Sequence, residues 1–285
     1  MLKVLLGRVC LLSLLLILGG CSTQFGYRFA DTFVEWQLAK YVDLSGQLED
    51  NVDRSIDELH LWHARTQLPR YRTMLDELIV TLDQDELGAR DIISYSDRLF
   101  DFWATIRNQL EPYALTYLPQ LSVEQREQLI SNLHERLEEE REEDAELDPS
   151  ERRRERLERT LERAKEWLGP LQAEQRTLLR RWLDDRVNNE AEWLAYQETW
   201  LELFATTLRD PAAPDYADRM SLLITAPDGL RSQVLVEANQ YNRALTQQLL
   251  LDLYQTLSFG QKRHLRNKLA DYRATVDSLI KNFAT

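Results

Sequence analysis

Apolar side chains recur along most of the chain at the three- and four-residue spacing of an amphipathic helix. Between Ser45 and Leu68, for instance, Val52, Ile56, Leu59 and His63 fall on one helical face. No stretch shows the two-residue alternation of a half-buried strand. The chain has only nine Gly and eight Pro, and it is rich in good helix formers. The pattern therefore predicts an all-α fold, an elongated bundle of packed helical hairpins.

Helix boundaries are indicated by Pro, Gly and polar residues. Pro69 is expected to break or kink the helix that begins at Ser45, and Pro112 and Pro119 are expected to bracket a linker. No break is polar or long enough to indicate a second domain, so we expect one helical domain over residues 27–285. The expected helices are 27–42, 45–68, 69–82, 89–110, one from Ser122, one ending near Leu168, 172–208, 216–224, 230–256 and 258–282.

One segment interrupts the apolar stripes. Of the 19 residues from Glu138 to Arg156, 15 are charged. Asp148, Pro149 and Glu151 give the signature of a new helix start. We expect a projecting helical hairpin with a charged tip that is stabilised by ion pairs between its two arms. The alternative is a docking surface for a basic partner.

The first twenty residues have the features of a secretory signal peptide. Lys3 and Arg8 precede an uncharged apolar run, and small residues follow it. That run, residues 9–20, has only twelve residues, whereas a membrane-spanning helix needs about 20. We therefore expect residues 1–20 to be removed.

The end of this segment, Leu18-Gly19-Gly20-Cys21, resembles the lipobox of bacterial lipoproteins. The resemblance implies that Cys21 receives a diacylglycerol, that the chain is cut before it, and that residues 21–26 form a lipidated tether. Ser22 resembles the class sent to the outer membrane, so the expected location is its periplasmic face, not the inner membrane. The alternative is a plain signal peptide followed by a chance cysteine.

Charge and cysteine content narrow the expected partners. Removal of Lys3 and Arg8 takes the formal net charge from −13 to −15, which argues against nucleic acid and against a polybasic membrane surface. With Cys10 removed and Cys21 lipidated, no cysteine remains for a disulfide. The expected attachment to the membrane is the covalent lipid on Cys21.

Three expected helix starts share a pattern that we call the glutamine motif, a Leu followed four residues later by Gln. The Ser and Gln of two copies fit a capping box, which needs no function beyond helix capping. The pattern also resembles the repeats of the periplasmic Spy-like proteins, which are α-helical chaperones. A partial copy, one residue short, is Leu44–Gln47. The full copies are Leu121–Gln125, Leu171–Gln175 and Leu257–Gln261.

Two further segments, Tyr41–Ser45 and Trp62–Tyr71, follow the lipobox. Together they resemble a family of uncharacterised proteobacterial helical lipoproteins. The resemblance implies an all-α lipoprotein over most of the mature chain and brings no assigned activity.

Candidate catalytic chemistry is sparse. His60 and His63 lie three residues apart beside Asp57 and Glu58, a spacing that suits two ligands of a metal site. His63, however, falls on the apolar stripe, where a buried histidine with satisfied hydrogen bonds is commoner. No hydrolase, phosphate-binding or zinc-protease motif is present, so we expect no catalytic residues, no cofactor and no metal.

The expected function is that of a non-enzymatic, lipid-anchored periplasmic protein acting by protein–protein contact, as a chaperone-like protein or adaptor in envelope maintenance. A chaperone-like protein would need an apolar groove, expected near the helices that begin at Ser122 and Ser258. The alternatives are a passive structural spacer at the outer membrane and an unrecognised metal-dependent enzyme.

Overall fold

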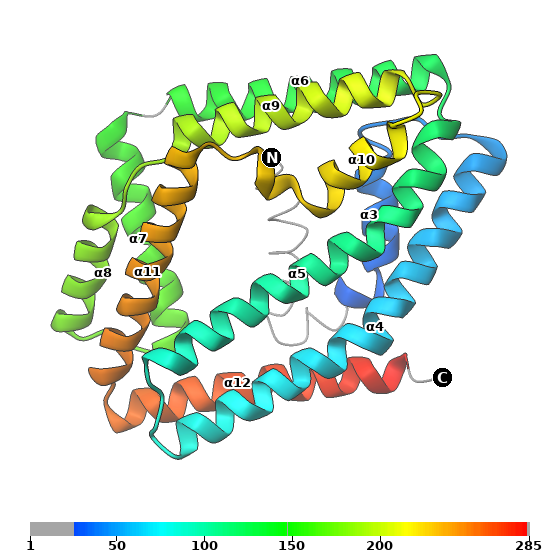
Figure 1. Ribbon diagram of the computed structural model, residues 1–285. Coiled ribbons are helices and arrows are strands. Elements are labelled where there is room, and N and C mark those ends of the chain that lie inside the picture. The colour runs from blue at the N-terminus through cyan, green and yellow to red at the C-terminus, as the bar shows by residue number, and fades with distance from the viewer. Residues whose placement is uncertain (1–25, 147, 284–285) are drawn as a thin grey trace.

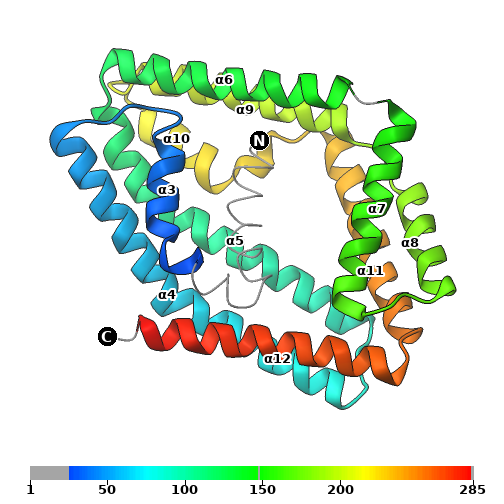
Figure 2. The same cartoon turned by 180° about the vertical axis from the view of Figure 1, so that it is seen from behind.

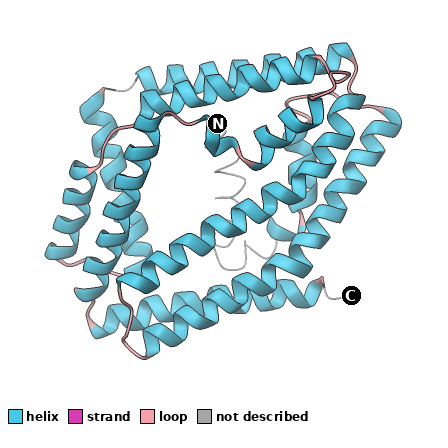
Figure 3. Cartoon of the chain, viewed as in Figure 1, coloured by secondary structure: helices cyan, strands magenta, loops and turns pink. Residues whose placement is uncertain are grey.

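A computed structural model describes residues 26–146 and 148–283, which form helices and no strands (Figure 3). The all-α prediction is confirmed. Within this part of the chain, no helix is both long enough and apolar enough to cross a membrane. The helices are α3 (Ala30–Leu38), α4 (Gly46–Asp83), α5 (Ala89–Tyr117), η2 (Leu118–Gln120), α6 (Val123–Glu146), α7 (Pro149–Leu168), α8 (Ala173–Asp185), α9 (Glu190–Arg209), α10 (Tyr216–Thr225), η3 (Pro227–Leu230), α11 (Gln233–Gln255) and α12 (Phe259–Asn282).

Neighbouring helices follow the sides of a four-sided frame (Figures 1 and 2). Helices α6 and α9 run together along one side, and α7, α8 and α11 form the next. Helix α12 packs along α4, and α5 runs beside α4 toward the corner where α6 begins. Helix α3 packs on α4 and lies on one broad side of the frame, behind α5 in Figure 1 and in front of it in Figure 2.

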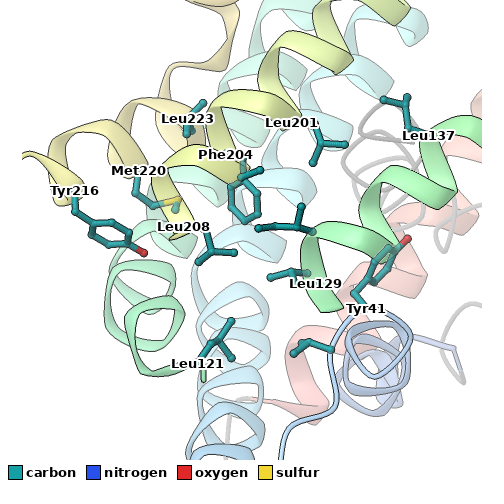
Figure 4. Close-up of a cluster of buried hydrophobic side chains, with 13 residues drawn as sticks. Tyr41, Leu121, Leu129, Leu137, Leu201, Phe204, Leu208, Tyr216, Met220 and Leu223 are labelled. Carbon is teal, nitrogen blue, oxygen red and sulfur yellow. The ribbon is translucent and has the colours of Figure 1, made fainter. Parts of the chain in front are cut away.

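The buried apolar side chains of the described residues gather in separate clusters along the frame. The first joins α6, α9 and α10, with Phe204, Leu208 and Met220 at its centre (Figure 4). A second cluster joins α4, α5 and α12 around Leu68 and Val276. A third joins α7, α8, α11 and the start of α12. Burial of apolar area is thus distributed along the sides of the frame, and each cluster stabilises its own helices.

Helix α9 contributes the aromatic side chains of Trp200 and Phe204 to the first cluster. Tyr196 and Phe204 are buried, and the ring of Trp200 stacks on that of Phe204 with centroids 5.0 Å apart. The indole of Trp200 also donates a hydrogen bond to the backbone carbonyl of Leu223 in α10. These aromatic side chains therefore belong to the core of the frame.

The expected breaks at Pro69 and Pro112 are wrong. Helix α4 continues through Pro69, and α5 continues through Pro112 to Tyr117. A proline inside a helix removes one backbone hydrogen bond. Leu68, just before Pro69, and Tyr71, two residues after it, are buried in the cluster shared with α12. This packing holds the helix on both sides of Pro69 despite the lost bond.

The single helix expected over 172–208 is also wrong, because α8 ends at Asp185 and α9 begins at Glu190. The buried side chain of Asn242 in α11 replaces helical hydrogen bonds here. It accepts from the backbone N–H of Val187 at 3.0 Å and donates to the Val187 carbonyl at 2.9 Å. A residue 55 positions away in sequence therefore determines where the helix stops.

The charged segment 138–156 is placed differently from the expected hairpin. Its two arms lie in α6 and α7, which turn a corner of the frame, and α6 packs on α9 while α7 packs on α8 and α12. Arg153 pairs with Asp184 of α8, and Arg156 pairs with Glu190 of α9. The second arm thus finds opposite charges on neighbouring helices. The side chains of residues 143–147 in the first arm lie outside the described part of the structure, so pairs between the two arms stay a prediction.

The start of α7 follows its sequence signature in part. Asp148 accepts a hydrogen bond from the backbone N–H of Ser150 at 2.8 Å, and Pro149 takes the first helical position. Glu151, which was expected to complete a capping box, forms an ion pair with Arg154 at 2.9 Å.

Candidate functional site

Helix α3, the first helix of the described chain, meets α4 through polar side chains. Tyr27, in the turn before α3, places its hydroxyl 2.7 Å from Nδ1 of His63 in α4. One helical turn later, Asp31 lies 3.5 Å from Nδ1 of His60. The two histidines singled out by their spacing therefore both face α3 and its entry turn.

His63 lies between two tyrosines. Its Nε2 atom is 3.1 Å from the hydroxyl of Tyr71, while its Nδ1 atom contacts Tyr27. A neutral imidazole has one donor and one acceptor nitrogen, so one tyrosine accepts and the other donates. Burial, with a smaller contribution from His60, lowers the pKa of His63 to about 4. Burial also raises the pKa of the Tyr27 hydroxyl, with Tyr71 adding to the effect.

His60 connects this contact to the end of the chain. Its ring lies edge-on to Tyr27 and to Phe283, with centroids 4.8 and 4.9 Å apart. The guanidinium of Arg65 donates to the backbone carbonyl of Phe283 at 3.2 Å. The entry to α3, the middle of α4 and the end of α12 thus meet at one point. We call this site the histidine junction and define it by Tyr27, Asp31, His60, His63, Tyr71 and Phe283.

The hydrogen bonds of the histidine junction affect whether His63 can be a metal ligand. Both ring nitrogens of His63 are occupied by tyrosine hydroxyls, so neither offers a lone pair to an ion while these bonds persist. Across the described residues, no three His, Cys, Asp or Glu side chains are arranged to hold a metal. His134 is exposed on α6, and His264 contacts the backbone carbonyl of Glu166 at 3.1 Å.

Opposite the histidine junction, α3 carries an aromatic stripe that faces outward. Phe29, Phe33 and Trp36 follow one another at i, i+4 and i+7, which places them on one face. Phe29 is 49% exposed and Trp36 is 56% exposed, and the Phe33 and Trp36 rings are in contact with centroids 5.8 Å apart. The ammonium of Lys40 lies 3.4 Å from the centroid of the Trp36 ring. The inward side of α3 is mixed, because Leu38 packs against the first cluster while Asp31 contacts His60.

Two of the glutamine motifs are joined by hydrogen bonds between their glutamine side chains. The side-chain amide of Gln175 donates to Gln261 at 3.0 Å, and that of Gln261 donates back at 2.9 Å. Gln261 also donates to the carbonyl of Pro170, and Gln175 donates to that of Thr256. Each of these carbonyls belongs to the residue just before the Leu of the other motif. The second and third motifs therefore bind each other reciprocally.

Each glutamine also caps its own helix. Gln175 accepts from the backbone N–H of Gln172 at 2.9 Å, and Gln261 accepts from that of Ser258 at 3.0 Å. The capping box inferred at Ser258 is thus present at α12, and α8 has one as well, although Gln172 stands there in place of a serine. Gln175 is fully buried and Gln261 nearly so, and the amide pair satisfies polar groups that would otherwise be stranded in the core.

The first glutamine motif pairs with the partial copy in the same way. The side chain of Gln125 accepts a hydrogen bond from the backbone N–H of Ser122 at 2.9 Å. It also donates to the carbonyl of Asp43, the residue just before Leu44, at 2.8 Å. The fifth position of the partial copy is Leu48, which packs in the first cluster and cannot reciprocate. Gln128 takes that place by bonding to both the backbone N–H and the carboxylate of Asp43.

The spacing of the motifs does not show which motif contacts which. Their repetition does indicate that they have something in common. A glutamine that recurs after the same leucine at several helix starts indicates that those starts share an environment. The residues just after two caps, Val123 and Phe259, are 64% and 81% exposed. Their helices begin at opposite corners of the frame (Figure 1), so no single groove adjoins both, contrary to the expected position of a chaperone groove.

The lipobox residues Leu18, Gly19, Gly20 and Cys21, and the expected signal peptide, lie outside the described residues.

The cavity between α4 and α5 is lined by Arg70, Thr73, Arg98, Asp101 and Phe102. Arg98 pairs there with Glu77, so the charge of that guanidinium is balanced.

Comparisons with known proteins identify one relationship. A model of a family of unknown function (DUF6279) matches residues 40–234, which include both segments on which the resemblance to uncharacterised lipoproteins depends. No curated protein and no solved structure matches the chain, and no further similarity to the Spy-like proteins is shown. The matched region covers more than half of the chain, and the protein therefore belongs to this family of unknown function.

Proposed function

We propose that this protein is a lipid-anchored periplasmic adaptor, held at the outer membrane by a lipid on Cys21, that acts by protein–protein contact and without catalysis. The observation that carries the proposal is the histidine junction. It fixes α3, the described helix nearest to Cys21, to α4 and to the end of α12. An anchor that continues into a fixed helix would hold the frame in a set orientation on the membrane.

Exposed apolar side chains on the frame support contact with a partner. Leu222 of α10 is 63% exposed and Phe259 of α12 is 81% exposed. Large apolar residues with this exposure are common at recognition surfaces when several share a face, and single ones are common on any surface. Contact with a partner through this apolar surface predicts that at least one of these positions is covered in the cell. A passive spacer predicts that both stay uncovered.

The proposal of a non-enzymatic role is supported by the chemistry of the two histidines. The ring nitrogens of His63 are used to hold Tyr27 and Tyr71, and the ring of His60 packs between Tyr27 and Phe283. These contacts give both side chains a structural role.

Photo-crosslinking in cells tests the contact function. A crosslinking amino acid is placed at Leu222 or at Phe259, and at Arg181 as an exposed control, since its side chain is 79% exposed and charged. We expect discrete crosslinked species from an apolar position that are weaker at Arg181 and that disappear when Cys21→Ala releases the protein. Membrane-bound protein that yields no crosslink at either apolar position would favour the passive spacer.

A further inference from the structure

The side chain of Arg107 in α5 is a buried cation that donates no hydrogen bond to any described residue. The residue is only 9% exposed, and its Nε atom is enclosed without an acceptor. Its ion pair is with Asp228 of η3, where the Nη2 atom lies 3.7 Å from the carboxylate, beyond hydrogen-bond distance. Burial of a guanidinium is costly unless its N–H groups are paired. The fold thus holds a cation at this point whose donors the described residues leave unused.

A second guanidinium shares the same carboxylate. Arg231, which follows η3, contacts Asp228 at 2.6 Å through its Nη2 atom, and its Nε atom is also buried without an acceptor. The guanidinium of Arg231 lies over the rings of Trp193 and Tyr196 in α9, 5.6 and 5.7 Å from their centroids. Aromatic rings hold a guanidinium by its face and leave its N–H edge available for an anion.

The charges at this point do not balance. Among the described residues, Asp228 is the one acidic residue that pairs with either arginine, so two guanidiniums share one carboxylate. Glu111, one helical turn from Arg107, bonds instead to the hydroxyl of Ser221. The side chain of Asp228 is 52% exposed, so it can turn away from the arginines into water. Two fixed arginines behind a displaceable carboxylate are suited to an incoming anion.

We propose that Arg107 and Arg231 bind a phosphate group where α5, α9 and η3 meet. In a guanidinium, Nε–H and one Nη2–H lie side by side on the same edge. The oxygens of Asp228 contact the Nη2 atoms and leave both Nε atoms without an acceptor. A phosphate group has enough oxygens to accept from both edges, and arginine edges match its geometry. The site goes beyond the proposed contact function and does not depend on a lipid on Cys21.

Binding of inorganic phosphate, followed by the broadening of its phosphorus NMR signal, tests the site. The full-length protein is purified from membranes in a nonionic detergent and titrated with sodium phosphate in place of sodium chloride at constant ionic strength. Arg107→Met removes the buried charge and keeps an unbranched side chain. Arg98→Met is the matched control, because Arg98 lies on the same helix and Glu77 balances its charge. Asp228→Asn removes the competing carboxylate and keeps both arginines.

We expect wild type and Arg98→Met to bind phosphate equally and Arg107→Met to bind at least about tenfold more weakly. Asp228→Asn should bind phosphate more tightly than wild type, which a purely structural ion pair does not predict. This variant also tests the site if circular dichroism shows that Arg107→Met does not fold. Equal binding in wild type and a folded Arg107→Met, or no binding in wild type and Asp228→Asn, would overturn the inference.

Competition in the same titration distinguishes two sources of the phosphate group, a lipid headgroup and a soluble compound. Inorganic phosphate is displaced from the wild-type protein with glycerol phosphate or with a short-chain phosphatidylglycerol. Stronger displacement by the phosphatidylglycerol supports the site and identifies a lipid headgroup. Equal or stronger displacement by glycerol phosphate supports the site and identifies a soluble compound. Displacement that is unchanged in a folded Arg107→Met would place the phosphate elsewhere and overturn the inference.

Discussion

The side chains of Gln175 and Gln261 donate hydrogen bonds to each other inside the protein, 86 residues apart in sequence. Each also caps its own helix, so one amide pair fixes the starts of α8 and α12 against each other. Because the third apolar cluster surrounds these helix starts, the pair satisfies polar groups at a point where water is excluded. The pair accounts for the recurrence of the glutamine motif without any appeal to ligand binding.

Removing one member of this pair is expected to be costly. Gln261→Ala removes both hydrogen bonds to the buried amide of Gln175 and the bond to the carbonyl of Pro170, so we expect a loss of about 2 to 3 kcal/mol in the free energy of unfolding. Gln125→Ala is the matched control. It removes the same cap at a more exposed position and should cost about 1 kcal/mol. Urea denaturation followed by circular dichroism measures both values.

The double variant Gln175→Leu/Gln261→Leu tests whether the two residues act as a pair. Each single change removes the two hydrogen bonds between the amides and leaves the other buried amide in place, whereas the double change leaves neither amide. We expect the double variant to lose at least about 1 kcal/mol less than the sum of the two single losses. Additive losses would show that each glutamine acts only as a cap.

Local signals in the sequence were sufficient to locate helices wherever the controlling residues are neighbours. The starts of α6 and α12 follow from Ser122 and Ser258, and the start of α7 follows from Asp148 and Pro149. These caps depend on residues no more than three positions apart. The interacting residues can therefore be recognised in a short stretch of sequence.

Distant contacts determine the features that the sequence did not reveal. Helix α4 passes through Pro69 because α12 packs along it, and the break between α8 and α9 depends on Asn242. The contact of Tyr27 with His63, 36 positions away in sequence, is likewise invisible in any short stretch of the chain.

Acidification is expected to weaken the histidine junction. His63 has a pKa of about 4 in the folded protein, below the ordinary histidine value, so the unfolded chain binds a proton more readily. Its contribution to stability is therefore complete above about pH 6.5 and is lost as the pH falls toward about 4. Between pH 7 and pH 5 we expect a loss of about 2 kcal/mol in the free energy of unfolding. Urea denaturation at a series of pH values measures this slope.

His63→Gln should remove most of that slope, since glutamine can bond to both tyrosines and does not titrate. His134→Gln is the control, because His134 is exposed on α6 and should leave the slope unchanged. A wild-type slope that persists in His63→Gln would place the pH dependence elsewhere in the protein.

The charged corner between α6 and α7 is expected to contribute to stability through Glu190. This carboxylate lies at the first position of α9, pairs with Arg156, and is 3.9 Å from Arg152. Glu190→Gln removes both pairs and a favourable charge at a helix N-terminus, so we expect a loss of about 1 kcal/mol. Glu155→Gln, which removes only the exposed pair with Arg159, should cost about 0.3 kcal/mol.

The same corner determines the expected result of deleting residues 138–156. A deletion would remove about 13 Å of α6 and about 12 Å of α7, two helices that diverge from each other. A short glycine turn cannot join the remaining ends while α6 stays on α9 and α7 stays on α8. We expect a large fall in melting temperature, and a shift of only a few degrees would show that the segment is a dispensable projection.

The intact mass of the protein extracted from membranes decides whether Cys21 anchors it. The Leu18–Cys21 motif predicts a chain that begins at Cys21 and carries the mass of a thioether-linked diacylglycerol in addition to residues 21–285. Cys21→Ala should leave an unprocessed precursor or release the protein from the membrane fraction. A mature chain that begins at another residue, or a free thiol on Cys21, would contradict the lipid anchor and the orientation proposed for the frame on the membrane.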